Sequence, residues 1–441
     1  MSNAERGNPI TRIVTATTKV EPNEIRATVL SFLFVFILMT AYFTIRPVRD
    51  AMASDWTRAE TSWLWTMTFF CSVVGVSLYG LILSRVNFRQ VVTGVYIFFA
   101  MSFVVFYFGS QTFSNPTLVD KSFYVWLSVF SLFHVSVFWS FMSGLFSKEQ
   151  APRLFAIIAS GASIGGIVGA AIPGFLAEEI GVMNLMLISA ALLLIPVPII
   201  RSLEELKVTK LGNRELEADL SQAKRLGKNP FAGFLLFIRN PYLLAIGVFI
   251  LMYVTMSTFI YMELREMLAV YERPERAEIL GRIDFWTNLL VVAIAFFATG
   301  RLATRFGMAT TLALIPALMV GGWLVVAALP FLGVLIGLQI ARKAGNYAVT
   351  RPGREMLFTL VDNETRYKAK PVIDIVVYRG GDMVTAWLHT FLRDVFAFGL
   401  GGVAMIAAVI AAVWAMAGLY LGRTYNQATI AGVPDAQEVT G

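Results

Sequence analysis

Four polar side chains recur at helical spacing just after the apolar run "LPFLGVLIGLQI". Lys343, Tyr347, Arg351 and Arg354 are separated by 4, 4 and 3 residues, the steps that bring side chains to one face of an α-helix. Several cations on one face can clamp a multiply charged group, and guanidinium forks suit phosphate in particular. The alternative interpretation is structural. In that case Arg351 and Arg354 reach the membrane interface, or pair with acids such as Glu355 to form a gate.

A second set of polar residues follows the same rule further along the chain. One face is predicted to carry five of them, separated by 4, 4, 3 and 4 residues: Asp374, Tyr378, Asp382, Thr385 and His389. The titratable members suggest a proton relay. The favoured alternative is ion pairing that acts in gating, with Asp374 beside Lys370 and Asp382 beside Arg379.

Two further features lie on earlier segments. Arg46 and Arg49 share a face with Tyr42, so both arginines are candidates for the same anion-binding cavity. The stretch "GASIGGIVG" (161–169) has a glycine at every fourth position, which predicts close packing of two helices rather than a nucleotide-binding loop.

The composition requires a membrane to position these residues. Of the 441 residues, 57% are hydrophobic and 15% are charged, against roughly 25% charged in soluble domains. A spanning helix needs about 20 apolar residues. Twelve segments meet that length: 26–46, 61–83, 91–109, 122–146, 154–177, 182–200, 241–262, 283–300, 308–328, 331–350, 371–391 and 399–422.

The cations in the loops predict how the chain is oriented. Lys and Arg are concentrated in the tails and in the loops on the same side, so we expect both termini in the cytoplasm of a multi-pass inner-membrane protein. The net charge of +7 is therefore no argument for nucleic acid. We predict five parts: a cytoplasmic tail (1–25), a six-helix half (26–200), a cytoplasmic linker (201–240), a second six-helix half (241–422) and a cytoplasmic tail (423–441).

Several classes of function find no support in the sequence. It contains no hydrolase triad, metal-ligand cluster or Walker motif, and Cys71 is its single cysteine. We expect neither an enzyme nor a resident cofactor or metal. Without a motif for ATP hydrolysis, any pumping must use exchange or an ion gradient.

The two predicted halves resemble each other at one offset. "VRDAMA" (48–53) falls on "LREMLA" (264–269), and a nearly equal shift places Gly165 and Gly166 on Gly380 and Gly381. This repeat predicts an all-α membrane protein of twelve transmembrane helices, built from two six-helix repeats. Such a plan is major-facilitator-like, with a binding site between the halves near the membrane midplane.

Four segments also resemble the ATP/ADP translocase family, the nucleotide-exchange transporters of plastids and intracellular bacteria, which are related to the major facilitator superfamily. They are "IRPVRDAMA" (45–53), "FWSFMSGLFSKEQAPRLFA" (138–156), "RPGREM" (351–356) and "DNETRYKAKPVIDIVVYRGGD" (362–382). The resemblance is to a divergent bacterial branch. It implies an exchanger of ATP, ADP or a related solute.

The resemblance also assigns roles to individual residues. Arg49 and Arg354 stand where the family has cavity lysines, and Glu263 matches an acidic residue at the end of the seventh span. Two departures make this cavity more cationic. Gly144 replaces an acidic residue, and Arg351 replaces an aspartate.

We therefore expect a secondary transporter for a nucleotide or another phosphorylated anion, with the bilayer as its surroundings and no protein partner identified by the sequence. Two alternatives remain open. One is a proton-coupled carrier of another organic anion. The other is a membrane subunit that anchors or regulates a partner without transporting anything.

Overall fold

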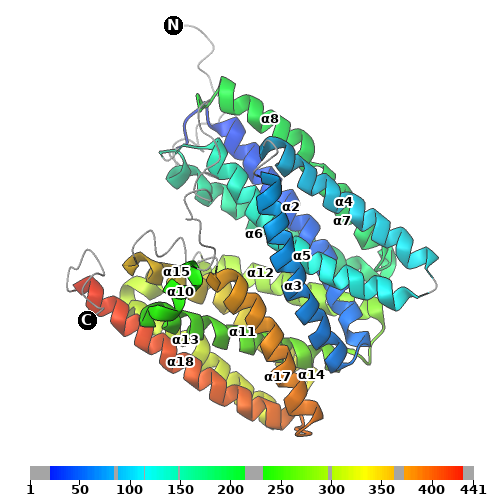
Figure 1. Cartoon of the computed structure of the whole chain (residues 1–441), viewed down its shortest axis with the longest axis vertical. Coiled ribbons are helices and arrows are strands. Elements are labelled where there is room, and N and C mark those ends of the chain that lie inside the picture. Colours follow the sequence, from blue (N-terminus) through cyan, green and yellow to red (C-terminus); the bar gives the residue numbers. More distant parts are fainter. Residues whose placement is uncertain are drawn as a thin grey trace. The chain divides into compact units, whose positions relative to one another are not determined.

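The computed structural model describes residues 20–83, 88–113, 115–147, 149–213, 232–295, 300–361 and 372–430. In these ranges the chain is helical and contains no strand (Figure 1). Most of both predicted tails, much of the linker and Lys370 lie outside them. The chain divides into two compact units, Met1–Arg49 with Gly75–Lys224 and Asp50–Val74 with Arg225–Gly441.

The first unit is built from long helices that follow one another closely in the chain. They are α2 (Ile25–Met52) up to Arg49, the end of α3 (Arg58–Leu83), α4 (Phe88–Thr112), α5 (Pro116–Leu145), α6 (Ala151–Ile180), α7 (Asn184–Leu194) and α8 (Pro196–Thr209). Together α7 and α8 form the sixth predicted span. The predicted linker starts inside α8, because this helix continues to Thr209.

The glycines of α6 press against α2. A Cβ atom at Gly161, Gly165 or Gly169 would lie 2.2–2.6 Å from a carbonyl oxygen of α2, a separation that excludes any side chain. Because the helices are this close, the Thr40 hydroxyl can donate a hydrogen bond to the carbonyl oxygen of Gly165, at 3.3 Å. The predicted packing of two helices through small residues is confirmed.

The second unit begins with Asp50–Val74, which belongs to the first six-helix half by sequence. It continues with α10 (Ala232–Arg239), α11 (Pro241–Leu268), α12 (Arg273–Ile294), α13 (Gly300–Ala328), α14 (Leu332–Gly345), the π-helix η4 (Asn346–Thr350), α15 (Arg351–Leu357), the 3₁₀-helix η5 (Phe358–Leu360), the π-helix η6 (Ile373–Gly380), α17 (Gly381–Asp394) and α18 (Leu400–Ile430). Asn240 starts α11, because its side-chain oxygen accepts the amides of Tyr242 and Leu243 at 3.0 and 3.1 Å.

Among the described residues, nine helices are long and apolar enough to cross a membrane. The other three predicted spans are helical as expected but more polar: α12, the run α14–η4–α15, and the run η6–α17. All three belong to the second unit. The polar residues that weaken them as apolar segments include those from which a binding site could be built.

Two π-helical turns, η4 and η6, interrupt the polar spans. Such turns are rare in proteins overall, and those that occur are often found at functional sites. After η4 the α-helix resumes directly as α15, with Pro352 in its first turn. The helix is therefore locally widened at this point rather than ended.

Candidate functional site

A polar pocket with a volume of about 370 Å³ lies in the second unit. Its lining comes from α11, η4, α15 and η6, so both π-helical turns contribute to it. Seven residues line it: Tyr253, Asn346, Tyr347, Arg351, Arg354, Glu355 and Tyr378. Three tyrosines, an amide and two arginines face a single carboxylate, so the lining is aromatic and cationic.

Arg354 is the most firmly held of these side chains. It is 5% exposed, and its guanidinium donates hydrogen bonds to the Tyr378 hydroxyl and, at 3.1 Å, to Oε1 of Glu355. The guanidinium carbon also lies 5.5 Å from the centre of the Tyr378 ring. Its Nε atom is buried and donates to no group in the described part of the chain.

Two aromatic rings lie between the guanidiniums of Arg354 and Arg342. The Tyr378 and Tyr253 rings meet edge to face at 6.3 Å, and the Arg342 guanidinium lies 5.4 Å from the centre of the Tyr253 ring. Arg342 is 2% exposed and donates to Oε1 of Gln339 at 2.8 Å. The negative face of an aromatic ring stabilises a nearby cation, so the two tyrosines help to stabilise Arg354 in the pocket lining and Arg342 outside it.

The predicted cationic face is only partly assembled in this pocket. Tyr347, Arg351 and Arg354 line it, whereas the Lys343 ammonium lies 2.7 Å from Oδ1 of Asp284 on α12, in a buried ion pair. The η4 turn separates Lys343 from the other cations. One extra residue in a turn rotates everything after it by about 100°, because an α-helix has 3.6 residues per turn.

Arg46 and Arg49 belong to the first unit. Arg49 donates to the Ser128 hydroxyl at 3.2 Å, and its guanidinium lies 5.2 Å from the centre of the Tyr124 ring. The Arg46 guanidinium lies 5.9 Å from the ring of Phe43. Both arginines are half-buried, and their predicted contact with an anion stays a prediction.

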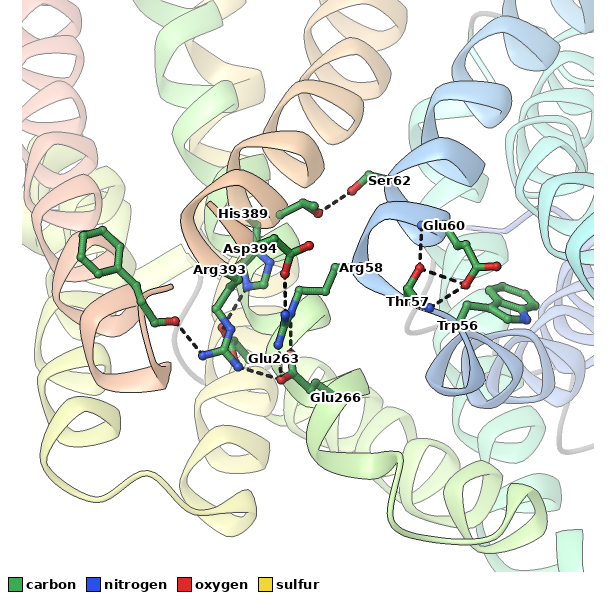
Figure 2. Close-up of polar contacts among 12 residues, drawn as sticks. Trp56, Thr57, Arg58, Glu60, Ser62, Glu263, Glu266, His389, Arg393 and Asp394 are labelled. Atoms are coloured by element: carbon green, nitrogen blue, oxygen red, sulfur yellow. Dashed lines mark hydrogen bonds and ion pairs between the residues drawn. The ribbon is translucent and has the colours of Figure 1, made fainter. Parts of the chain in front are cut away.

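Glu263 and His389 form a buried pair, shown in Figure 2. The Nε2 atom of His389 lies 2.8 Å from Oε1 of Glu263, and both side chains are almost fully buried. Arg393 approaches the same carboxylate oxygen at 3.5 Å. Glu263 is not among the residues that line the pocket. The binding role that the translocase resemblance implies for Glu263, and the gating or proton-relay role predicted for His389, stay predictions.

This pair is one side of a larger ion-pair cluster, which we define as Arg58, Glu263, Glu266, His389, Arg393 and Asp394. Figure 2 shows Arg58 directed toward both Glu266 and Asp394. Its guanidinium contacts Glu266 with two nitrogens, at 2.9 and 2.5 Å, and Asp394 at 2.6 Å. Arg393 shares Glu266, at 2.7 Å. Such bidentate, shared contacts are the strong form of an ion pair.

The cluster connects α3 to α11 and α17, and local sequence positions Arg58 for this role. Thr57 and Glu60 form a capping box at the start of α3: the Thr57 amide donates to Glu60 at 2.8 Å, and the Glu60 amide donates to the Thr57 hydroxyl at 3.2 Å. Arg58 is therefore fixed in the first turn of the helix. Nearby, the hydroxyls of Ser62 and Thr390 are 2.9 Å apart.

Further arginines hold the connection between α2 and α3 in the second unit. Asp55, in the short 3₁₀-helix η2 (Ala53–Asp55), contacts both Arg273 and Arg276 at 2.5 Å. Arg265 donates to the carbonyl oxygens of Ala53 and Trp56. The segment that follows α2 is thus joined to α11 and α12 through side chains of both.

The remaining predicted gating residues lie near the start of α17. Arg379 and Asp382 form the expected ion pair, at 3.7 Å. The side chain of Asp374 lies outside the described part of the structure, as does Lys370, so their pairing stays a prediction.

Sequence reasoning missed several members of both groups. Asp284 lies in a predicted span, where an ionisable residue by itself marks a candidate site, so that signal was present. Tyr253 and Asn346 carry no charge and are not distinguished from core residues by spacing. Arg58 and Asp394 lie at the ends of helices, where charged residues are ordinary, and no sequence signal joins them.

Comparisons with known proteins agree with this architecture. The ADP,ATP carrier protein 1 of Chlamydia pneumoniae is 24% identical over 218 residues, 44% of this chain and 42% of the carrier. That of Chlamydia muridarum is 24% identical over 254 residues, 51% of this chain and 47% of the carrier. The matches therefore span about half the length of these relatives. They confirm the resemblance to ATP/ADP translocases as a sequence similarity.

Solved structures show the same fold. The nucleoside transporter NupG superposes with a TM-score of 0.61 at 16% identity, covering 91% of this chain and 99% of NupG. A bacterial homologue of the human lysosomal transporter Spinster superposes with a TM-score of 0.59 at 12% identity, covering 92% and 98%. The sequence model of the Major Facilitator Superfamily matches residues 30–348, which is most of the chain. The chain therefore belongs to the Major Facilitator Superfamily of membrane transporters.

Proposed function

We propose that this protein is a secondary transporter that moves a nucleotide, or a closely related phosphorylated anion, across the inner membrane by alternating access. The observation that carries the proposal is the pocket in which Arg351 and Arg354 stand beside three tyrosines. Two guanidiniums can bind a phosphate through paired hydrogen bonds. Aromatic rings can stack on a base, as they do in proteins that bind single-stranded nucleic acids.

The relatives support the chemical class of this substrate. The Chlamydia proteins are named as carriers of ADP and ATP, and both arginines lie in a segment where this chain resembles that family. The substitution of Arg351 for an aspartate widens the range of anions that fit. We therefore include nucleotides other than ATP and ADP, and other organophosphates, among the candidates.

Alternating access requires a contact that opens and closes, and we propose the ion-pair cluster for this role. Residues 50–74 belong to the first six-helix half by sequence, yet they pack in the second unit. Arg58 holds this segment through Glu266 and Asp394. If the two halves move apart during transport, these ion pairs must break in every cycle.

Uptake into proteoliposomes tests the proposal. Labelled ATP, ADP and AMP should accumulate, with uptake stimulated by unlabelled nucleotide inside. The Arg354→Ala variant should lose at least about 2 kcal/mol of anion binding, roughly thirtyfold, because the anion loses its buried cationic partner.

The matched control is Arg239→Ala, which removes an exposed arginine at the end of α10 and should leave uptake unchanged. Absence of uptake of any nucleotide or organophosphate by the folded wild-type protein would overturn the proposal.

The buried Glu263–His389 pair favours a second candidate, a proton-coupled carrier of an organic anion. A carboxylate and an imidazole in hydrogen-bond contact form an arrangement through which a proton can be relayed. A protonophore should then abolish uptake, and internal nucleotide should not stimulate it. Nucleotide exchange predicts the opposite result for both measurements.

A further inference from the structure

The one carboxylate of the pocket contacts its most buried cation. Of the seven lining residues, Glu355 alone is acidic, and its Oε1 lies 3.1 Å from the Arg354 guanidinium. The Glu355 side chain is 39% exposed, whereas that of Arg354 is 6% exposed. Glu355 can therefore turn away into the pocket, while the Tyr378 contacts hold Arg354 in place.

Arg354 needs a negative partner in every state of the protein. Burying a guanidinium without a counter-charge is costly, because the group loses its hydration without compensation. In this structure Glu355 supplies the negative charge. An anionic substrate that binds at Arg354 would supply it instead.

From this arrangement we infer that Glu355 is a built-in competitor of the substrate: it occupies the anion position on Arg354 until an anionic group that binds Arg354 more strongly displaces it. The inference rests on the proposed function and identifies the phosphate dianion as the group selected. Because every ligand must displace it, such a competitor keeps weakly bound anions from Arg354.

The preference for a phosphate over a carboxylate follows from the exchange of one anion for another at Arg354. A singly charged carboxylate that displaces Glu355 replaces one carboxylate contact with another, so it gains little at Arg354. A phosphate carries a second charge and additional oxygens. It can contact Arg354 and the exposed Arg351 at once, so its gain exceeds the cost of separating Arg354 from Glu355.

A matched pair of ligands tests this on the purified full-length protein. AMP and adenosine-5′-carboxylic acid share a nucleoside and differ in their anionic group, and ADP serves as a further phosphorylated probe. Binding is measured by titration calorimetry. We expect the wild type to bind AMP at least about tenfold more tightly than the carboxylate. In Glu355→Gln both ligands should bind at least about threefold more tightly, because neither then has to displace a carboxylate from Arg354.

The Glu355→Asp variant keeps the charge and should keep affinities near those of the wild type, which separates a charge effect from a change of shape. Glu355→Ala provides a second neutral variant, and a melting curve verifies that each protein is folded. If the wild type binds AMP or ADP but neither neutral variant binds either ligand more tightly, the inference fails and the proposed function stands. If the folded wild type binds no phosphorylated probe, the proposed function fails and the inference with it.

Discussion

The pocket and the ion-pair cluster share α11 and the run η6–α17, yet they balance charge differently. On α11, Tyr253 of the pocket and Glu263 of the cluster are ten residues apart, about 15 Å along a helix. The pocket sets two arginines against one glutamate. The cluster sets two arginines against three carboxylates, with an imidazole beside them.

The difference indicates what each group is built to do. In the cluster the charges satisfy one another through several short contacts, so it holds helices together and needs no ligand. In the pocket, the buried Arg354 contacts one half-exposed carboxylate and packs against the ring of Tyr378. Such a group is stabilised by an anion from outside. An acid therefore has opposite roles in the two places.

The largest effect should come from locking the cluster. The hydroxyls of Ser62 on α3 and Thr390 on α17 are 2.9 Å apart. Starting from Cys71→Ser, which removes the exposed native thiol, the double variant Ser62→Cys, Thr390→Cys should form a disulfide that abolishes transport. Nucleotide binding should survive, and a reductant should restore uptake in proteoliposomes. Full transport by the cross-linked protein would show that this contact does not open.

Neutralising the acid of each group should change the protein in different ways. Glu266→Gln leaves Arg58 and Arg393 with less compensation, so it should lower the free energy of unfolding by about 1–2 kcal/mol. Glu355→Gln also removes a counter-charge, but an anion can replace it at Arg354, so its melting temperature should recover when AMP is bound and its binding of a monoanion should strengthen. Melting temperature and calorimetry measure the two effects. A loss of stability in both variants that AMP does not reverse would remove the contrast.

A double-mutant cycle sharpens this result. Arg58→Gln and Glu266→Gln, separately and combined, should show a coupling of at least about 0.5 kcal/mol in unfolding free energy, because the two groups contact each other directly. The control cycle joins Arg58→Gln with Arg239→Ala, two arginines with no contact between them in the described structure, and should be additive.

Removing Arg351 should have a smaller effect on binding than removing Arg354. Arg351 is exposed and lines the pocket, so its loss should weaken AMP binding by about 1.5 kcal/mol, roughly tenfold. Arg351→Lys should recover part of it, since charge returns without the planar fork. Equal losses of AMP affinity for Arg351→Ala and Arg354→Ala would mean that the more buried arginine does not contribute more to binding.

The smallest effect concerns Arg342, which is not in the pocket lining but stacks on Tyr253. Arg342→Met keeps much of the volume and removes the charge. It should reduce affinity for AMP by roughly threefold, the scale of one cation–π contact, and leave the melting temperature equal or higher. A clear fall in stability would show that Arg342 has a mainly structural role.

Sequence alone predicted the architecture well, because long apolar segments and the glycines of α6 are local signals. It placed Tyr347, Arg351 and Arg354 on one face, and all three line the pocket. It placed Lys343 on the same face, but Lys343 pairs with Asp284 on α12, a partner that helical spacing does not reveal. The partners in the cluster could not be predicted, since Arg58 and Glu266 are 208 residues apart and only the fold brings them together.

The π-helical turn η4 has a consequence for how this site could have arisen. Arg342 and Lys343 precede it, and Arg351 and Arg354 follow it. One added residue in this turn would be enough to separate the cations into two groups, one facing neighbouring helices and one facing the pocket. Deleting a single residue from 346–350 should therefore rotate the following arginines away from the pocket, although no binding residue need be lost. The identity of the site would then depend on the register of the helix as much as on its side chains.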